Sequence, residues 1–189
     1  MKKNPITIGF DDATFDFNSR SNAVPLIGVI CQGVRVIKVL KENIIIDGEN
    51  ATSTLINMVL KVKDLVQYIV THSITFGGFN LVDIEKIYKK TGIPIIAVTE
   101  SEVDLPSVKK ALEINFPKKF QEKIQKIINA GNLYNAQIET AGGISTVHFH
   151  VKGMDKNLVE NLLSQISIDS KLPESVRIAH IIGRAFRGD

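Results

Sequence analysis

The sequence has a single cysteine, no tryptophan and no long uninterrupted hydrophobic run. One cysteine, Cys31, excludes an internal disulfide and fits a reducing compartment. No histidine adjoins Cys31 in the sequence, so we expect it to be a small apolar side chain within a strand. No segment approaches the roughly 18 apolar residues that a membrane span needs, and the first ten residues lack the apolar core of a signal peptide. We therefore expect a cytoplasmic protein without a membrane partner.

The chain also lacks a strong excess of charge of either sign. It has 23 Lys and Arg residues against 20 Asp and Glu residues, a balance that permits binding to nucleic acid without requiring it. Its 189 residues, 44% of them hydrophobic, suit one core and are too few for two. We expect a single domain over residues 1–189, and the pattern predicts no particular oligomeric state.

The chain begins with strands and continues with alternating helices and strands. A tight turn at Gln32-Gly33 should join the second and third strands, and Asn50 is placed to cap the first helix. The predicted strands are 6–10, 24–33, 34–46, 67–72, 93–98, 135–140 and 145–153. The predicted helices are 51–62, 80–92, 105–116, 117–131, 155–166 and 173–186.

This order of elements is the connectivity of a ribonuclease H-like fold. Three antiparallel strands come first, and helical crossovers then lead to parallel strands in the same mixed sheet, with helices flanking it. In that architecture the first strand lies beside the first parallel strand at the sheet centre. The polar ends Asp11-Asp12 and His72-Ser73 should therefore meet.

Acidic residues follow two of the predicted strands. Asp11 and Asp12 come directly after "ITIGF", and Asp47 follows the third strand in "IIIDGEN". Each has two explanations: a solvated turn or helix cap, or a site for a divalent cation that relieves the repulsion between carboxylates.

The stretch "TFGGFN" at residues 75–80 supports two interpretations. Asn80 and Asp83 resemble a capping pair for the following helix, and Gly77-Gly78 would let the chain turn sharply into it. A phosphate could also bind at such a helix N-terminus, where free N–H groups favour an anion. The candidate substrate-binding residues are Phe76, Gly77, Gly78, Phe79 and Asn80.

Two helices carry charged stripes. Arg177, His180 and Arg184 share one side of the last helix, which is explained either by an ordinary surface stripe or by contact with a phosphate near the acids. Lysines of the helix 117–131, including Lys123 and Lys126, are most simply a solvated face opposite its isoleucines.

Four segments together resemble the archaeal endonuclease dU family, which is related to endonuclease V. They are "IGFDDATF", "IIIDGENATSTLINMVL", "SITFGGFNLVDIEKIYKKTGIPIIAV" and "PESVRIAHIIGRA", and the resemblance extends from about residue 6 to residue 187. It implies an endonuclease V-like form of the ribonuclease H-like fold. It also implies a hydrolase of DNA repair that cleaves deoxyuridine-containing DNA with a divalent metal, Mg or Mn.

The resemblance assigns roles to particular residues. The family's acidic pair corresponds to Asp11 and Asp12, and its next acid to Asp47, whereas the family's Asp-Gly-Ile-Thr-Phe is His72-Ser73-Ile74-Thr75-Phe76 in this chain. The implied catalytic residues are Asp11, Asp12, Asp47, Arg177 and His180, and the implied metal ligands are Asp11, Asp47 and His72.

The replacement of a carboxylate by His72 leaves three outcomes open. The metal preference changes toward softer ions, Asp12 or Asp83 takes the place of the lost acid, or the site binds without cutting. The alternatives to an endonuclease are thus a non-catalytic nucleic-acid-binding protein and a small-ligand-binding protein with the same fold.

Overall fold

A seven-stranded mixed sheet runs through the centre of the protein. The structure is a computed structural model that describes residues 3–15 and 22–186, so part of the polar connection predicted at 11–22 lies outside the described residues. The strand order is β3-β2-β1-β4-β7-β9-β8, and a short hairpin, β5-β6, stands apart. The strands are β1 (Ile6–Asp12), β2 (Ala23–Gln32), β3 (Arg35–Ile45), β4 (Tyr68–His72), β5 (Thr75–Phe76), β6 (Asn80–Leu81), β7 (Ile95–Thr99), β8 (Tyr134–Thr140) and β9 (Gly143–Lys152).

The strand pairing confirms the predicted connectivity. β1, β2 and β3 form an antiparallel meander, and β4 and β7 then extend the sheet parallel to β1. The later hairpin, which the sequence does not place, adds to the edge of the same sheet, because β9 pairs antiparallel with β7. Asp11 and His72 follow the paired residues Phe10 and Thr71, so they end adjacent strands as expected.

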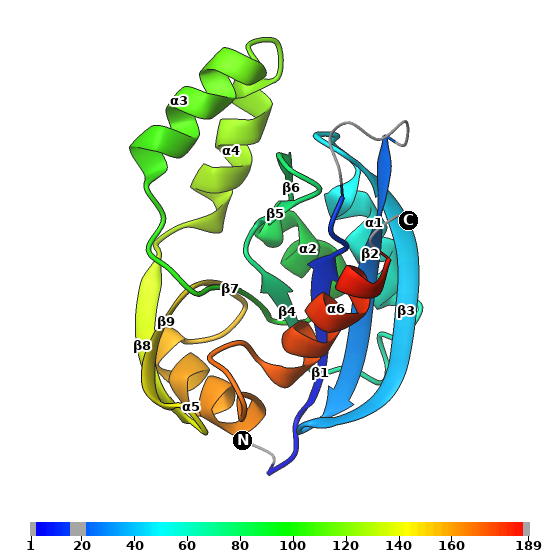
Figure 1. Cartoon of the computed structure of the whole chain (residues 1–189), viewed down its shortest axis with the longest axis vertical. Coiled ribbons are helices and arrows are strands. Elements are labelled where there is room, and N and C mark those ends of the chain that lie inside the picture. The colour runs from blue at the N-terminus through cyan, green and yellow to red at the C-terminus, as the bar shows by residue number, and fades with distance from the viewer. Residues whose placement is uncertain (1–2, 16–21, 187–189) are drawn as a thin grey trace.

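Helices cover both faces of this sheet (Figure 1). The helices are α1 (Ala51–Leu60), α2 (Ile84–Thr91), α3 (Leu105–Asn115), α4 (Phe120–Ala130), α5 (Lys156–Ile166) and α6 (Glu174–Ala185). One core cluster joins α1 and α2 to Ile8, Phe10 and Ile69, and a second joins α5 and α6 to Val70 and Ile96. A smaller third cluster lies between β2 and α6. Figure 1 shows α6 crossing β1 and β2, while the α3–α4 hairpin projects from one end of the sheet. Each helix of the described chain is too short or too polar to cross a membrane.

Strand β1 is longer than predicted and includes both aspartates. Asp11 pairs with Ile27 and Asp12 with Leu26, so the two acids belong to the strand and do not form a turn. Because side chains alternate along a strand, their carboxylates point to opposite faces of the sheet. Cys31 is buried in β2 as predicted, and burial raises the pKa of its thiol to about 11.

The start of α2 also differs from the prediction. Asp83 is the N-cap, accepting a hydrogen bond from the Lys86 N–H, and α2 therefore begins at Ile84 instead of residue 80. Asn80 is in β6, where its side-chain oxygen accepts a hydrogen bond from the Ala51 N–H at the start of α1. Asn50 has the N-cap position of α1, but its side chain makes no capping bond. The first turn of α1 is thus capped by a residue 29 positions later in the chain.

Candidate metal centre

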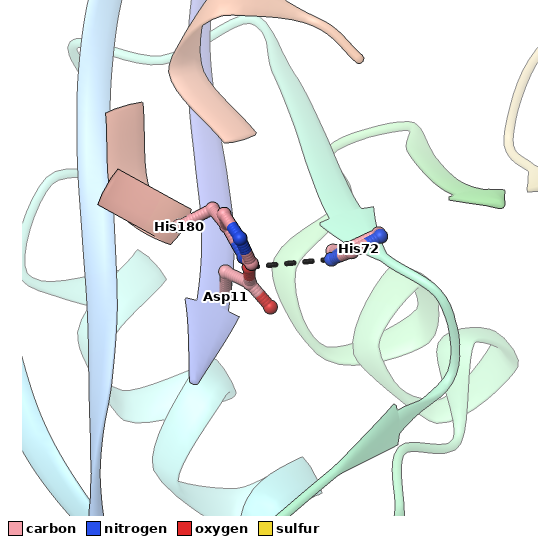
Figure 2. A group of neighbouring side chains, drawn as sticks. All are labelled: Asp11, His72 and His180. Carbon is pink, nitrogen blue, oxygen red and sulfur yellow. Dashed lines mark hydrogen bonds and ion pairs between the residues drawn. The ribbon is translucent and has the colours of Figure 1, made fainter. Parts of the chain in front are cut away.

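Three side chains meet at the end of β1 on the α6 face of the sheet (Figure 2). Asp11 Oδ2 lies 3.2 Å from His72 Nδ1 and 2.7 Å from His180 Nδ1. One potential ligand atom from each residue falls within 4.8 Å of the other two. Ligands that bind one ion at about 2.0–2.2 Å must lie about this close together. Asp11, His72 and His180 are thus a group that could hold a metal ion, and we use the name metal centre for this candidate site.

Backbone packing brings the three residues together from distant parts of the sequence. The parallel pairing of β1 with β4 sets Asp11 beside His72. Helix α6 lies so close to β1 that a Cβ atom on Gly9 would be only 2.4 Å from the backbone of Ser175 and Val176. Glycine at position 9 therefore allows the close approach that carries His180 to Asp11.

The metal centre is anchored by a buried acid and open to solvent at its histidines. Asp11 is 4% exposed, whereas the side chains of His72 and His180 are 26% and 40% exposed. Burial lowers the pKa of His72, but its hydrogen bond to Asp11 and the charges of Asp11, Glu100 and Asp12 raise that pKa above its usual value. In the absence of metal, this environment therefore favours the protonated form of the His72 imidazole.

A carboxylate on the next strand end approaches the other side of His72. Glu100 follows β7, and its Oε2 lies 3.9 Å from His72 Nε2. The Glu100 backbone carbonyl accepts a hydrogen bond from Lys171, which ties this loop to the segment before α6. His72 thus lies between two acids, Asp11 at Nδ1 and Glu100 at Nε2.

The other two predicted acids bind the backbone of the Gly-Gly loop, residues 77–79. Asp12 Oδ2 accepts a hydrogen bond from the Gly77 N–H at 2.9 Å, and Asp47 Oδ1 accepts one from the Phe79 N–H at 2.8 Å. A Cβ atom on Gly78 would lie 2.3 Å from Asp47 Oδ1, so only glycine fits there. These loop amides are therefore occupied by carboxylates and are not free to hold a phosphate.

The environments of Asp12 and Asp47 are unusual for acidic side chains. Burial raises the pKa of Asp12 to about 6, and the neighbouring charge of Asp11 adds to the shift, although the Gly77 N–H opposes it. Asp47 has a left-handed backbone (φ 56°), which is uncommon for a residue other than glycine. Among the described residues, Asp47 is not part of the metal centre, and its predicted role as a ligand stays a prediction.

A buried lysine also holds the Gly-Gly loop in place. Lys123 of α4 is fully buried, and its Nζ donates to the backbone oxygens of Phe79 (2.7 Å), Gly48 (3.2 Å) and Asp47 (3.4 Å). Glu49 pairs with both Lys123 and Lys126. Although burial raises the pKa of Glu49, the hydrogen bonds from these lysines lower it below its usual value. The prediction that these two lysines form a solvated face was wrong, because the helix packs against carbonyls that need a donor.

The structure separates the two residues predicted on the last helix. His180 reaches Asp11, whereas Arg177 pairs with Glu174 and Asp169. The hydrogen bonds that Arg177 donates to Glu174 raise the pKa of Arg177 above its usual value. The sequence pointed to His180 as a catalytic residue but not as a metal ligand. No signal in the sequence shows this, because it depends on how α6 crosses β1 in the folded protein.

Comparisons with known proteins agree with this architecture. The profile of the family described as endonuclease dU matches residues 5–187. A UPF0215 protein of Pyrococcus horikoshii is 32% identical over 188 residues, which cover 98% of this chain and 93% of that protein. A UPF0215 protein of Nanoarchaeum equitans is 35% identical over 192 residues, which cover 100% of this chain and 92% of that protein.

Solved structures extend the comparison to more distant proteins. A protein of unknown function from Archaeoglobus fulgidus matches with a TM-score of 0.84 and 28% identity, covering 98% of this chain and 99% of that one. Ciona intestinalis endonuclease V, solved with DNA containing inosine, matches with a TM-score of 0.60 and 8% identity, covering 94% of this chain and 83% of that one. The second match shows a shared ribonuclease H-like fold.

Proposed function

This chain belongs to the endonuclease dU family, and on that premise we propose that it is a metal-dependent endonuclease of damaged, deoxyuridine-containing DNA. The observation that carries the proposal is the convergence of Asp11, His72 and His180 at the strand end. The presence of DNA in the endonuclease V structure supports nucleic acid as the partner class.

The donor set of the metal centre fits a divalent transition metal. One carboxylate and two imidazoles are softer ligands than the all-oxygen sets preferred by Mg, and they suit Mn, Fe, Ni or Zn. We therefore propose Mn, of the two metals expected from the sequence, as the better match. A divalent cation held there would supply a nucleophile from water at neutral pH and stabilise the departing oxygen of a phosphodiester.

The protein side chains divide into two groups around this chemistry. Asp11, His72 and His180 would hold the cation, and the exposure of both histidines leaves room for a phosphate to approach. Asp12 and Asp47 would keep the Gly-Gly loop in one conformation, so that the partly exposed ring of Phe79 is held in a fixed place, while Phe76 and Asn80 are buried and support the loop from inside. Rigid support of this kind is what positions a substrate for reaction.

One observation favours a second candidate, a protein that binds nucleic acid without cutting it. His72 replaces the acid that the family motif carries at this strand end, and loss of a hard oxygen ligand weakens binding of Mg.

Cleavage assays separate the two candidates. Single- and double-stranded oligonucleotides with one deoxyuridine are incubated with Mg, Mn, Co or Zn, and with no metal. We expect cleavage with Mn that is lost in Asp11→Asn. Binding without cleavage in every metal would support the second candidate.

A further inference from the structure

Strand β3 forms one border of the sheet and has a long outer edge. It has 11 residues and pairs with β2 alone among the strands of residues 3–15 and 22–186. Figure 1 shows β3 along one side of the molecule. The backbone N–H and C=O groups on such an edge can pair with a strand of another chain. Strand β3 is therefore a candidate interaction surface.

Exposed apolar side chains are concentrated on β3. Four of them are between 40% and 45% exposed: Val36, Ile37, Val39 and Ile45. The ring of Phe186 at the end of α6 is also exposed and lies beside β3, because its centroid is 4.7 Å from Lys41 Nζ. At the other border of the sheet, β8 has seven residues and contributes no exposed large apolar side chain in the described chain. Since burial of apolar area favours association, β3 is the border that gains from a partner.

The end of β3 shows which backbone groups point to the open edge. The Ile46 N–H donates to the carbonyl of Asn22, on the β2 side. The Ile45 N–H donates to Asn50 Oδ1, on the side away from β2. Backbone direction alternates along a strand, so the odd-numbered residues of 39–43 point their N–H and C=O groups to the open edge. A strand that pairs with this edge must therefore bond to those residues.

A second copy of β3 matches this edge in one register. In two-fold antiparallel pairing, opposite residues must point their backbone groups the same way, so an odd-numbered residue lies opposite an odd-numbered one. With the axis beside Leu40, Lys38 lies opposite Glu42 of the partner subunit, and Glu42 lies opposite the partner's Lys38. An axis beside Lys38, Lys41 or Glu42 would instead set like charges opposite each other. Strand β8 has no lysine or arginine and cannot pair with itself in this way.

The charged groups have room to meet. Lys38 is exposed, and the Glu42 side chain is 43% exposed. Glu42 accepts a hydrogen bond from Lys61 at 2.7 Å, which uses one of its two carboxylate oxygens. An open hollow of about 580 Å³ borders Glu42 between β3 and α1, and it can receive the lysine of a second copy.

We propose that two copies of this chain associate through β3, with the two-fold axis beside Leu40, and join their sheets into one. The inference does not rest on the proposed function, because β2 separates β3 from the strand that carries Asp11. Residues opposite each other share a face of the sheet, so both metal centres would open on the same face. The two β1 strands would run in opposite directions.

The first test is the mass of the full chain in solution. Sedimentation equilibrium is measured from about 1 to about 100 µM, a range that includes the dissociation constants of small interfaces. We expect the mass to rise to twice the 20.9 kDa of one chain. A mass of one chain at every concentration would overturn the proposal.

A proline variant tests the backbone of the edge. Val39→Pro removes an N–H that points to the open edge, so the bonds between β2 and β3 are kept. This variant should be a monomer, whereas Val39→Thr, which keeps the N–H, should remain a dimer. Circular dichroism confirms that both variants are folded. A folded Val39→Pro that still forms the dimer would overturn the proposal.

A charge exchange tests the register without a change in the backbone. Lys38→Glu sets two like-charged pairs at symmetric positions and should raise the dissociation constant by about tenfold. The double variant Lys38→Glu/Glu42→Lys sets opposite charges together again and should recover the wild-type value. Lys109→Glu, at an exposed residue of α3, makes the same change in net charge and should have no effect. A double variant as weak as Lys38→Glu would overturn the register.

Disulfide formation tests the position of the axis directly. In Leu40→Cys the new thiol lies opposite its own copy, where a pair without backbone hydrogen bonds has Cα atoms about 4.5 Å apart and can form a disulfide. In Val39→Cys the two thiols lie diagonally, about 7–8 Å apart, which is too far. Mild oxidation should therefore cross-link Leu40→Cys alone, since Cys31 is buried in both variants and in the wild type. Cross-linking of Val39→Cys alone, or of neither variant, would overturn the proposed register.

Discussion

Replacing Lys123 with methionine should strongly destabilise the protein. Methionine keeps most of the length of the stem and removes the ammonium group. Three backbone oxygens and Glu49 then lose a donor inside the protein. The ring of Phe116, whose centroid lies 4.9 Å from Lys123 Nζ, loses a cation contact as well.

The magnitude of this effect can be bounded from the structure. Removing one partner of a buried ion pair costs about 3–5 kcal/mol, because the other charge is left uncompensated. Glu49 keeps Lys126 as a partner and is partly exposed, so we expect the lower end, about 3 kcal/mol. With a urea m-value of about 2 kcal/mol/M, the unfolding midpoint should fall by about 1.5 M.

Urea denaturation followed by circular dichroism measures this change, with Lys119→Met as the control. Lys119 is on the same helix and forms a surface pair with Glu122, and such pairs contribute about 0–1 kcal/mol. A midpoint in Lys123→Met that differs from the control by less than about 0.5 M, at unchanged m-value, would refute the reasoning. It would mean that the loop carbonyls find other donors.

Four further predictions concern the acids and the metal centre. Asp11→Asn should abolish the rise in unfolding temperature caused by Mn, since an ion that binds the native state alone raises stability. In Asp47→Asn the amide oxygen can still accept the hydrogen bond from the Phe79 N–H. This variant should keep the rise in unfolding temperature if Asp47 only supports the loop, and lose it if Asp47 is a ligand. His72→Asp should shift metal preference in calorimetric titrations from Mn or Zn toward Mg, because it restores an oxygen ligand; an unchanged preference would show that His72 is not a ligand. The apparent affinity for Mn should fall as the pH decreases through the pKa of His72, which is raised above its usual value of 6.5, because the proton competes with the metal for the imidazole. An affinity that does not change between about pH 6 and about pH 8 would contradict this. Without metal, the raised pKa of Asp12 means that the folded state holds the carboxyl proton more tightly than the unfolded state, so stability falls as the pH rises from about 3.8 to about 6. Asp12→Asn should remove this cost and stabilise the protein at about pH 8 by at most about 3 kcal/mol. Thermal unfolding should show a smaller gain at about pH 4.

The sequence was sufficient for five of the seven strands of the central sheet and for two of the three residues of the metal centre. Hydrophobic runs and the switch from consecutive strands to alternating elements predict that β1 and β4 are neighbours, and this places Asp11 beside His72. His180 required knowledge of how α6 crosses the sheet, which depends on the close contact at Gly9 and leaves no periodic signal in the sequence.

The errors share one physical cause, which is that partners distant in the chain override local preference. Aspartate is a poor strand former, yet pairing with β2 extends β1 through Asp12. Local spacing predicts Asn80 as a cap for the next helix, but the Ala51 N–H is its partner. The amphipathic pattern of its helix predicts Lys123 at the surface, but its ammonium group bonds loop carbonyls inside the protein.

The three residues of the metal centre come from distant segments of the chain, and this has a consequence for folding during synthesis. Asp11 and His180 are 169 positions apart, so a growing polypeptide has no metal centre until the segment that forms α6 has been synthesised and has docked. The sheet strands β1 to β4 can pair earlier, and until then they present an acid and one imidazole, a pair that retains an ion poorly. The three side chains that could hold a metal ion are thereby assembled only when the fold is nearly complete.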